Sequence, residues 1–416
     1  MATGRERNRT IAVLCGAVVV VAVVAVAMFL GMSRSGSTSR MTSEQMACGE
    51  DHVLVIDAAG DVYAWGHNLM GELGDVTCDD KSEPVRIEVP GRVVQVAAGD
   101  ELSFALCKNG DLYAWGNNES YQMGDGMNIS RMEPEKIMED VEAIAAGSYH
   151  ALAIKEDGAL YVWGRNKDGA LGIAESDCDQ TDESGYACQS TAVKLMDDVV
   201  DISAGLDYSM AITSDGTLYA WGHNVEGQLG LAETDSVNDN DQPYQSVPAK
   251  VMDGVTDVAC GARYQALALT EAGDLYCWGK AIVGSVSTRE VDDTENMIQT
   301  RPLKIMEDVK EIAAGSAHSL ALKTDGTLYT WGVNNYGQMG TKRGEFQYAI
   351  GEELIYCQET PRELAKNVEA IAAGGFMSMY RSADGVLRSV GCNVYGQLGI
   401  GSEKSSVTTP TAISLK

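Results

Sequence analysis

The dipeptide Trp-Gly recurs along this chain and uses all six of its tryptophans. Successive copies are 48 to 58 residues apart, and a degenerate seventh copy, Val390-Gly391, follows in register. Self-similarity at such a period is typical of solenoids and propellers, in which each repeat forms one supersecondary unit. We interpret the tryptophans as large apolar wedges between neighbouring repeats. They are Trp65, Trp115, Trp163, Trp221, Trp278 and Trp331.

Each repeat also holds an Ala-Ala-Gly-like element followed by a turn dipeptide. In the clearest copy, Ala313-Ala314-Gly315 precedes Asp325-Gly326. Asp-Gly between apolar runs predicts a β-hairpin, because both central residues adopt positive φ. The flanking runs are apolar on both faces, which is typical of strands sandwiched between layers. The sequence therefore predicts an all-β fold, a seven-bladed β-propeller spanning residues 46–416.

The chain ends indicate how the ring closes. A strand that contains a proline opens the later repeats, but the first repeat lacks its own copy. A matching segment, Thr409-Pro410-Thr411, lies at the opposite end of the chain. We therefore expect the C-terminal strand, within 406–416, to complete the first blade, which leaves no open sheet edge.

The repeat resembles that of the regulator of chromosome condensation family. The resemblance rests on the Ala-Ala-Gly, Asp-Gly and Trp-Gly elements and on a Gly-Gln-Leu-Gly element, here Gly227-Gln228-Leu229-Gly230 and Gly396-Gln397-Leu398-Gly399. It covers 46–416 and departs at Lys280 to Gly284 and at Val390, where those elements are lost. The resemblance implies a seven-bladed propeller used for protein contacts. For some members it also implies guanine-nucleotide exchange on a small GTPase.

The N-terminus predicts a membrane anchor. Residues 11–31 carry no charge and are mostly Val and Ala, which is long enough to span a bilayer as a helix. Three arginines precede this segment and two follow it, so residues 1–10 are predicted to be cytoplasmic and the propeller extracytoplasmic. A cleaved signal peptide is the alternative. Residues 32–45 read as a flexible stalk. We interpret the chain as a bacterial, membrane-anchored, single-pass family member in the cell membrane.

Charge restricts the class of partner. The chain carries a formal net charge of −29, and the first 40 residues are basic, so the propeller is strongly acidic. Nucleic-acid recognition needs a basic face, so no nucleic-acid partner is expected. An acidic surface favours cationic partners.

The segments that lengthen individual repeats fall mostly at one point of the repeat, between the Gly-Gln-Leu-Gly element and the next proline strand. They are 75–83, 173–190, 231–246, 285–300 and 341–359. In a repeat array such insertions share one face, often the binding face. Their acidic and aromatic residues are the candidates for gripping a basic protein or peptide; solvated loops without a ligand are the alternative. The candidates are Asp177, Asp179, Asp182, Glu183, Tyr186, Asp235, Asp239, Asp241, Tyr244, Asp292, Asp293, Phe346 and Tyr348.

Chemistry beyond binding has little support in the sequence. Cys178 and Cys188 lie in one polar insertion and are a candidate disulfide. No zinc spacing is present, so no metal site is predicted. Asp177-x-Asp179 and Asp239-x-Asp241 offer oxygen ligands for calcium but lack the glycine and terminal Glu of an EF-hand loop. No nucleophile, zinc-protease or phosphate-binding motif occurs, so we predict a non-enzyme without catalytic residues or cofactors.

The first hypothesis is therefore a membrane-tethered, cell-surface propeller whose loop face binds another protein. The alternatives are an exchange factor for a small GTPase and a cell-wall or glycan-binding protein. Location separates the first two, because a GTPase substrate is cytosolic.

Overall fold

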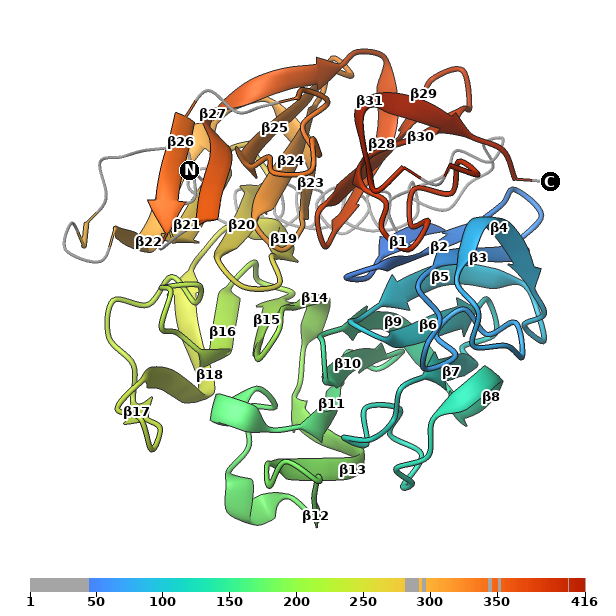
Figure 1. Ribbon diagram of the computed structural model, residues 1–416. Helices are drawn as coiled ribbons and strands as arrows, with labels where there is room; N and C mark the ends of the chain where they lie inside the picture. Colours follow the sequence, from blue (N-terminus) through green and yellow to red (C-terminus); the bar gives the residue numbers. More distant parts are fainter. Residues whose placement is uncertain are drawn as a thin grey trace, which may run out of the picture. The chain divides into compact units, whose positions relative to one another are not determined.

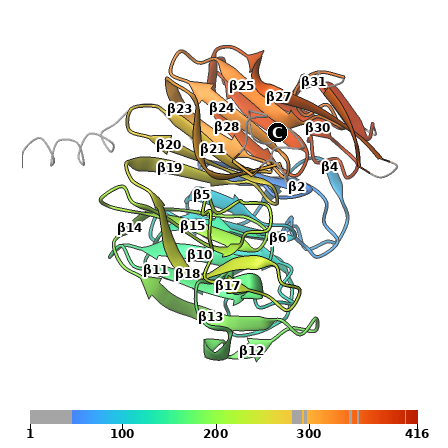
Figure 2. The same cartoon turned by 90° about the vertical axis from the view of Figure 1, so that its left-hand side faces the viewer.

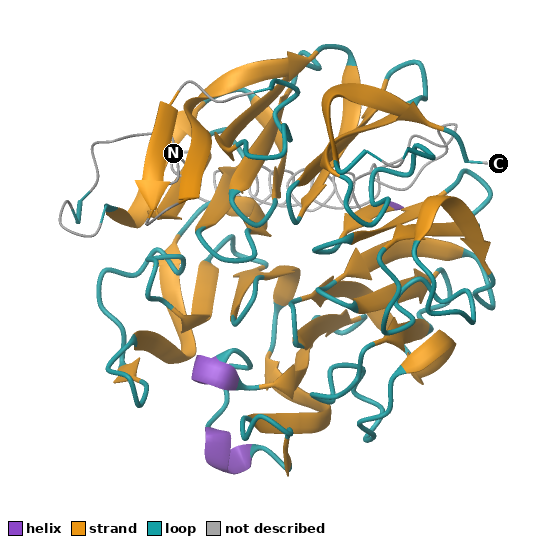
Figure 3. Cartoon of the chain, viewed as in Figure 1, coloured by secondary structure: helices purple, strands orange, loops and turns teal. Residues whose placement is uncertain are grey.

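Seven antiparallel sheets are arranged radially around one axis (Figure 1; Figure 2 turns the view by 90°). The computed structural model describes residues 45–280, 292–293, 297–342, 346–350, 353–402 and 404–415. The described residues fall within one compact unit, Met41–Lys416. Strands and loops make up almost all of it, and two short 3-10 helices are described: η3 (Glu175–Asp177) lies in the 173–190 insertion and η2 (Lys167–Gly169) shortly before it (Figure 3). The predicted all-β, seven-bladed propeller is confirmed.

Each blade is one continuous stretch of chain. Blades 1 to 3 comprise β1 (Met46–Cys48), β2 (His52–Ile56), β3 (Val62–Gly66) and β4 (Lys81–Ile87); β5 (Val93–Ala98), β6 (Leu102–Cys107), β7 (Leu112–Gly116) and β8 (Arg131–Met138); and β9 (Val141–Ala146), β10 (His150–Lys155), β11 (Leu160–Arg165), β12 (Gln180–Thr181) and β13 (Ala187–Met196).

Blades 4 and 5 comprise β14 (Val199–Ala204), β15 (Tyr208–Thr213), β16 (Leu218–His223), β17 (Ser236–Val237) and β18 (Pro243–Met252); and β19 (Val255–Cys260), β20 (Gln265–Thr270), β21 (Leu275–Lys280) and β22 (Ile298–Met306). Blades 6 and 7 comprise β23 (Val309–Ala314), β24 (His318–Lys323), β25 (Leu328–Val333), β26 (Phe346–Ile350) and β27 (Glu353–Ala365); and β28 (Val368–Gly374), β29 (Met377–Ser382), β30 (Leu387–Cys392) and β31 (Ser406–Ile413).

The turn dipeptides join the second and third strands of each blade, so the predicted hairpins form, but only the glycine of each dipeptide adopts positive φ, where the sequence predicted both residues. Gly326 adopts φ +83° and its N–H donates to the carbonyl of Lys323 at 2.9 Å. The Asp325 carboxylate accepts the Thr327 N–H at 2.8 Å. A glycine is needed there because side chains rarely adopt this conformation.

The predicted closure of the ring by the C-terminal strand is wrong. β31 pairs with β30 inside blade 7, and blade 1 is complete with its own β4, which pairs with β3. The proline strand therefore ends the core of four strands in its own repeat and does not open the next repeat; in blades 4 and 6 the short β17 and β26 pair with only one end of it. A proline is tolerated there because an outermost strand needs N–H donors on one side only.

Blades 7 and 1 close the ring through side chains. Met377 and Met379 of blade 7 pack in one buried cluster with Val53 and Val55 of blade 1. The Gln397 side chain donates to Asp51 at 2.6 Å. Each innermost strand contacts the innermost strands of its two neighbours, β1 and β28 included.

The tryptophans of blades 1 to 5 form the same hydrogen bond to the preceding blade. Their indole N–H groups donate, at 2.8 to 3.0 Å, to a carbonyl in that blade's Gly-Gln-Leu-Gly element or its equivalent. All six side chains have no exposed surface. A Cβ at Gly124 would lie 2.6 Å from Trp163, so the element's final glycine is required for the indole to fit. The accepting residues are Gln397, Glu72, Gln122, Ala170 and Gln228.

Three buried histidines also connect neighbouring blades. His52, His150 and His318 contact serine hydroxyls of the next blade at 2.8 to 3.0 Å. Burial lowers the pKa of each to about 4, so these side chains are neutral at physiological pH. They stabilise the scaffold.

The predicted anchor at 11–31, with residues 1–10 and all of the stalk except Gln45, lies outside the described residues. Among the residues that are described, no helix has the length and apolar character needed to cross a membrane.

Candidate functional site

The insertions share one face of the propeller, which we call the insertion face. Consecutive strands of every blade are antiparallel, so the loops after the first and third strands emerge on the same side. The insertions follow the third strand, and the Ala-Ala-Gly elements end the first. The turn dipeptides lie on the opposite face. The insertion face therefore combines the lengthened loops with the loops that surround the axis.

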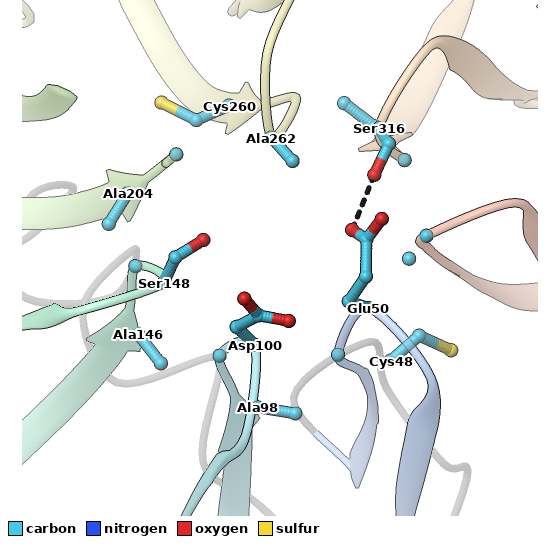
Figure 4. Close-up of a pocket in the computed structure, with 18 of the residues that line it drawn as sticks. Cys48, Glu50, Ala98, Asp100, Ala146, Ser148, Ala204, Cys260, Ala262 and Ser316 are labelled. Carbon is cyan, nitrogen blue, oxygen red and sulfur yellow. Dashed lines mark hydrogen bonds between the residues drawn. The ribbon is translucent and has the colours of Figure 1, made fainter. Parts of the chain in front are cut away.

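At the axis, two carboxylates occupy a shallow cavity with an empty volume of about 410 Å³. Glu50 follows β1 and Asp100 follows β5, and both side chains point into the space between the blades (Figure 4). The Ser316 hydroxyl donates to Glu50 at 2.6 Å. Small residues, mainly Gly and Ala, form the remaining wall, so the two carboxylates are the main charged groups that line it. We call this cavity the axial mouth.

The surroundings of the axial mouth disfavour the charged form of its carboxyl groups. Burial is the largest cause that raises the pKa of Asp100 to about 6; the charges of Glu50 and Glu101 contribute to this rise, and a hydrogen bond with Tyr149 and the charge of Arg263 oppose it. Burial also raises the pKa of Glu50 and of Asp51. A cation that enters the mouth would relieve this repulsion, so the site favours ammonium or guanidinium groups.

Two of the predicted binding residues are held by a neighbouring cation instead. Arg165 lies over the Tyr149 ring at 4.0 Å and the Tyr186 ring at 5.1 Å. Its guanidinium donates to Asp182 at 2.7 Å, and the Asp182 side chain is only 2% exposed. Asp182 is therefore an internal ion-pair partner, while Tyr186, 39% exposed, presents part of its ring to solvent.

Three other predicted aspartates close their own loops. Each accepts the backbone N–H and the hydroxyl of a Ser or Thr inside the return strand, at 2.6 to 2.8 Å. These two hydrogen bonds to one residue hold the base of each insertion in place. The pairs are Asp179 with Ser190, Asp235 with Ser246, and Asp292 with Thr300.

The remaining candidates divide by exposure. Asp177, Glu183, Asp239 and Asp241 are exposed on the insertions of blades 3 and 4. Tyr244 and Asp293 are half-buried, and Asp293 forms a bridge with Ile298. The Phe346 and Tyr348 side chains lie outside the described residues, although their backbone belongs to β26.

The predicted disulfide is not formed. Cys178 and Cys188 are free thiols. The Cys178 thiol donates a hydrogen bond to the Ala174 carbonyl, and the Cys188 thiol donates one to the Tyr186 carbonyl. No group of three or more His, Cys, Asp or Glu within the described chain is placed to hold a metal ion.

Residues 32–264 and 198–416 match the family of RCC1-like domains. The chain belongs to this family. The Arabidopsis thaliana ultraviolet-B receptor UVR8 is 31% identical over 209 residues, 49% of this chain and 43% of the receptor. The probable E3 ubiquitin-protein ligase HERC6 of Homo sapiens is 30% identical over 211 residues, 48% of this chain and 19% of the ligase. The match spans less than half of either relative.

Solved structures show the same RCC1-like fold. Prp20p from Saccharomyces cerevisiae superposes with a TM-score of 0.72 at 23% identity, covering 85% of this chain and 86% of Prp20p. Human WBSCR16 superposes with a TM-score of 0.69 at 20% identity, covering 85% and 94%. At these identities the likeness concerns the fold alone.

Sequence reasoning missed the axial mouth of this RCC1-like propeller. Glu50 and Asp100 each follow the glycine of an Ala-Ala-Gly-like element directly. Other repeats place Ser148, Leu206 or Ala262 there, so the slot looks unconstrained along the chain. Aligning all seven repeats in a ring would have shown two acidic residues in adjacent blades facing one axis.

Proposed function

We propose that this RCC1-like propeller binds a protein partner through its insertion face, and that a Lys- or Arg-rich segment of the partner occupies the axial mouth. The observation that carries the proposal is the pair of half-buried carboxylates, Glu50 and Asp100. They lie close enough for the charge of Glu50 to raise the pKa of Asp100. Exposed Asp177, Glu183 and Asp239 on the surrounding insertions extend the acidic surface. Such a surface steers cationic segments toward the mouth.

One protein of the same fold has partners of the proposed class. Prp20p of Saccharomyces cerevisiae binds Gsp1p and histones, and histones are strongly basic proteins. The acidic insertion face of this chain offers the complementary charge. Guanine-nucleotide exchange on a small GTPase is the alternative function that the similarity to Prp20p suggests.

The location proposed from residues 11–31 is the cell membrane, with the propeller outside. Protease digestion of intact cells, followed by detection of the propeller, measures this directly. Loss of the propeller supports the surface location. Protection from the protease supports a cytosolic propeller, where a GTPase would be accessible.

Binding is tested with the full chain and a labelled peptide of alternating Lys and Ser, by fluorescence anisotropy at low salt. Glu50→Gln with Asp100→Asn is expected to weaken binding by about tenfold. Glu156→Gln with Glu271→Gln is the matched control, because it removes two exposed carboxylates from the opposite face. Equal affinities for the two double variants would refute the axial mouth as the binding site.

A further inference from the structure

The insertion face also carries an exposed apolar patch where blades 1 and 2 meet. We define this apolar patch as Leu69, Val76, Met127, Ile129 and Met132, whose residues are between 47% and 64% exposed. Large exposed patches of this kind on an otherwise polar surface mark interaction sites.

The two loops that form the patch are in direct contact. The Val76 N–H donates to the Met132 carbonyl at 2.9 Å. The Cys78 thiol lies 3.5 Å from the Met132 sulfur. A Cβ at Gly71 would lie 2.8 Å from the Met132 side chain, so the turn that carries Leu69 packs closely on the same residue. Leu69, Val76 and Met132 therefore share one surface, and the Met127 sulfur, 3.5 Å from the Arg131 guanidinium, adjoins it.

Blade 7 continues this surface. Its turn carries Val394 and Tyr395, which are 56% and 37% exposed. The Tyr395 ring meets His67 of blade 1 edge-on, with ring centroids 4.6 Å apart.

Val76 occupies a backbone conformation that suits glycine. Its φ is +61°, and it lies two residues after the last glycine of the Gly-Gln-Leu-Gly-like element. Blades 2 and 7 place Gly126 and Gly401 at that position, with φ +79° and +62°. The N–H at all three positions donates to the next blade, to a carbonyl of β8, β13 or β4.

A β-branched residue in this region is strained, and here its side chain is 64% exposed as well. Local strain of this kind gathers at functional sites. Folding alone would favour glycine at position 76, as in blades 2 and 7.

Charge around the patch indicates the partner's chemistry. The two cations at its edge are already paired, Lys81 with Asp75 at 3.3 Å and Arg131 with Asp125 at 3.2 Å. Asp79 and Glu133, both exposed, have no ion pair within the described chain. A partner segment that covers the patch therefore meets apolar side chains bordered by negative charge.

We propose that the apolar patch binds a segment of the partner in which apolar side chains alternate with or are flanked by Lys or Arg. This inference rests on the proposed protein-binding function and adds a second determinant to it. The axial mouth selects for positive charge, and the apolar patch selects among positively charged segments.

The test compares two labelled peptides of equal charge, one of Leu and Lys and one of Ser and Lys, on the full chain. The Leu/Lys peptide is expected to bind at least about tenfold more tightly. Val76→Gly and Ile129→Ser, singly and together, are expected to remove this preference and leave Ser/Lys binding unchanged. Val200→Ser with Val247→Ser, two exposed valines outside the patch, is the control.

Val76→Gly separates binding from folding. Relief of the positive φ is expected to leave the melting temperature equal or higher, while the Leu/Lys preference falls. A lower melting temperature, with the preference unchanged, would show that Val76 serves the fold and would overturn the proposal.

Cys78 reports occupancy, because it is an exposed thiol beside Met132. The Leu/Lys peptide is expected to slow alkylation of Cys78, followed by mass spectrometry, and the Ser/Lys peptide is not. Protection by phosphatidylcholine vesicles, or a dimer that Val76→Gly disperses in sedimentation, would overturn the proposal in favour of a membrane or a second copy. If both peptides bind equally but still need Glu50 and Asp100, the apolar patch fails and the proposed function stands.

Discussion

At the scale of single residues, each tryptophan indole acts on two blades at once. Trp163 is fully buried, and its N–H donates to the Gln122 carbonyl of the preceding blade at 2.9 Å. The Phe104 ring of that blade meets the indole edge-on, with centroids 6.2 Å apart. Burial and hydrogen bonding are therefore coupled at the same interface between blades.

Replacement of Trp163 tests this coupling. Trp163→Phe leaves the Gln122 carbonyl without its donor and leaves part of the indole volume empty. We expect the free energy of unfolding to fall by about 2 to 4 kcal/mol. Urea denaturation measures the change, with Tyr186→Phe as an exposed aromatic control. A loss as small as that of the control would contradict the wedge role.

Buried histidines predict a dependence of stability on pH. The pKa of His318 is about 4 in the folded chain because of burial, against 6.5 ordinarily. Between these values the unfolded chain binds a proton that the folded chain does not, so the free energy of unfolding falls as pH falls through this window. His52 and His150 act in the same direction.

His318→Gln isolates one of these sites, because Gln265 occupies the same repeat position in blade 5. The variant is expected to lose less stability between pH 6.5 and pH 4 than the parent, by up to about 1.4 kcal/mol per pH unit. Urea denaturation at several pH values measures the slope. Parallel slopes for the two proteins would rule out the titration of His318.

At the scale of elements, the proline strand of each blade belongs to the same repeat as the three strands before it. Deletion of 406–416 therefore removes β31 from blade 7 and leaves blade 1 whole. We expect a lower melting temperature, because Ile413 leaves the buried cluster shared by blades 7 and 1.

Hydrogen exchange distinguishes the pairing of β31 with blade 7 from the pairing with blade 1 that the sequence suggested. In the truncated chain, β30 amides are expected to lose protection while β3 amides keep theirs. Faster exchange in β3 instead would mean that the C-terminal strand pairs with blade 1.

The same element scale shows where sequence reasoning succeeded and failed. The Trp-Gly period predicted seven blades, because each copy marks the third strand of one sheet. The partner of the proline strand could not be predicted, since such a strand lies between two sheets and the chain alone does not say which it joins. Asp179 and Asp235 read as free surface charges because their Ser partners lie 11 residues further on.

At the scale of the whole molecule, we expect the proposed partner binding to depend on protonation of the axial mouth. Burial raises the pKa of Asp100 to about 6, so this carboxylate gains its full charge only above that pH. A Lys/Ser peptide is therefore expected to bind more tightly as pH rises from 5 to 7.5. Anisotropy titrations measure this, and Asp100→Asn is expected to flatten the profile. An unchanged profile in Asp100→Asn would place the titrating group elsewhere.

No sheet in the described ring borrows a strand from another repeat. A break in the backbone between β18 and β19 would therefore leave every sheet intact on both sides, and the two pieces would differ from the parent only at two interfaces between blades. Such halves are expected to recombine into a working ring when mixed. By the same logic, gain or loss of a complete repeat during descent requires no change inside the remaining ones.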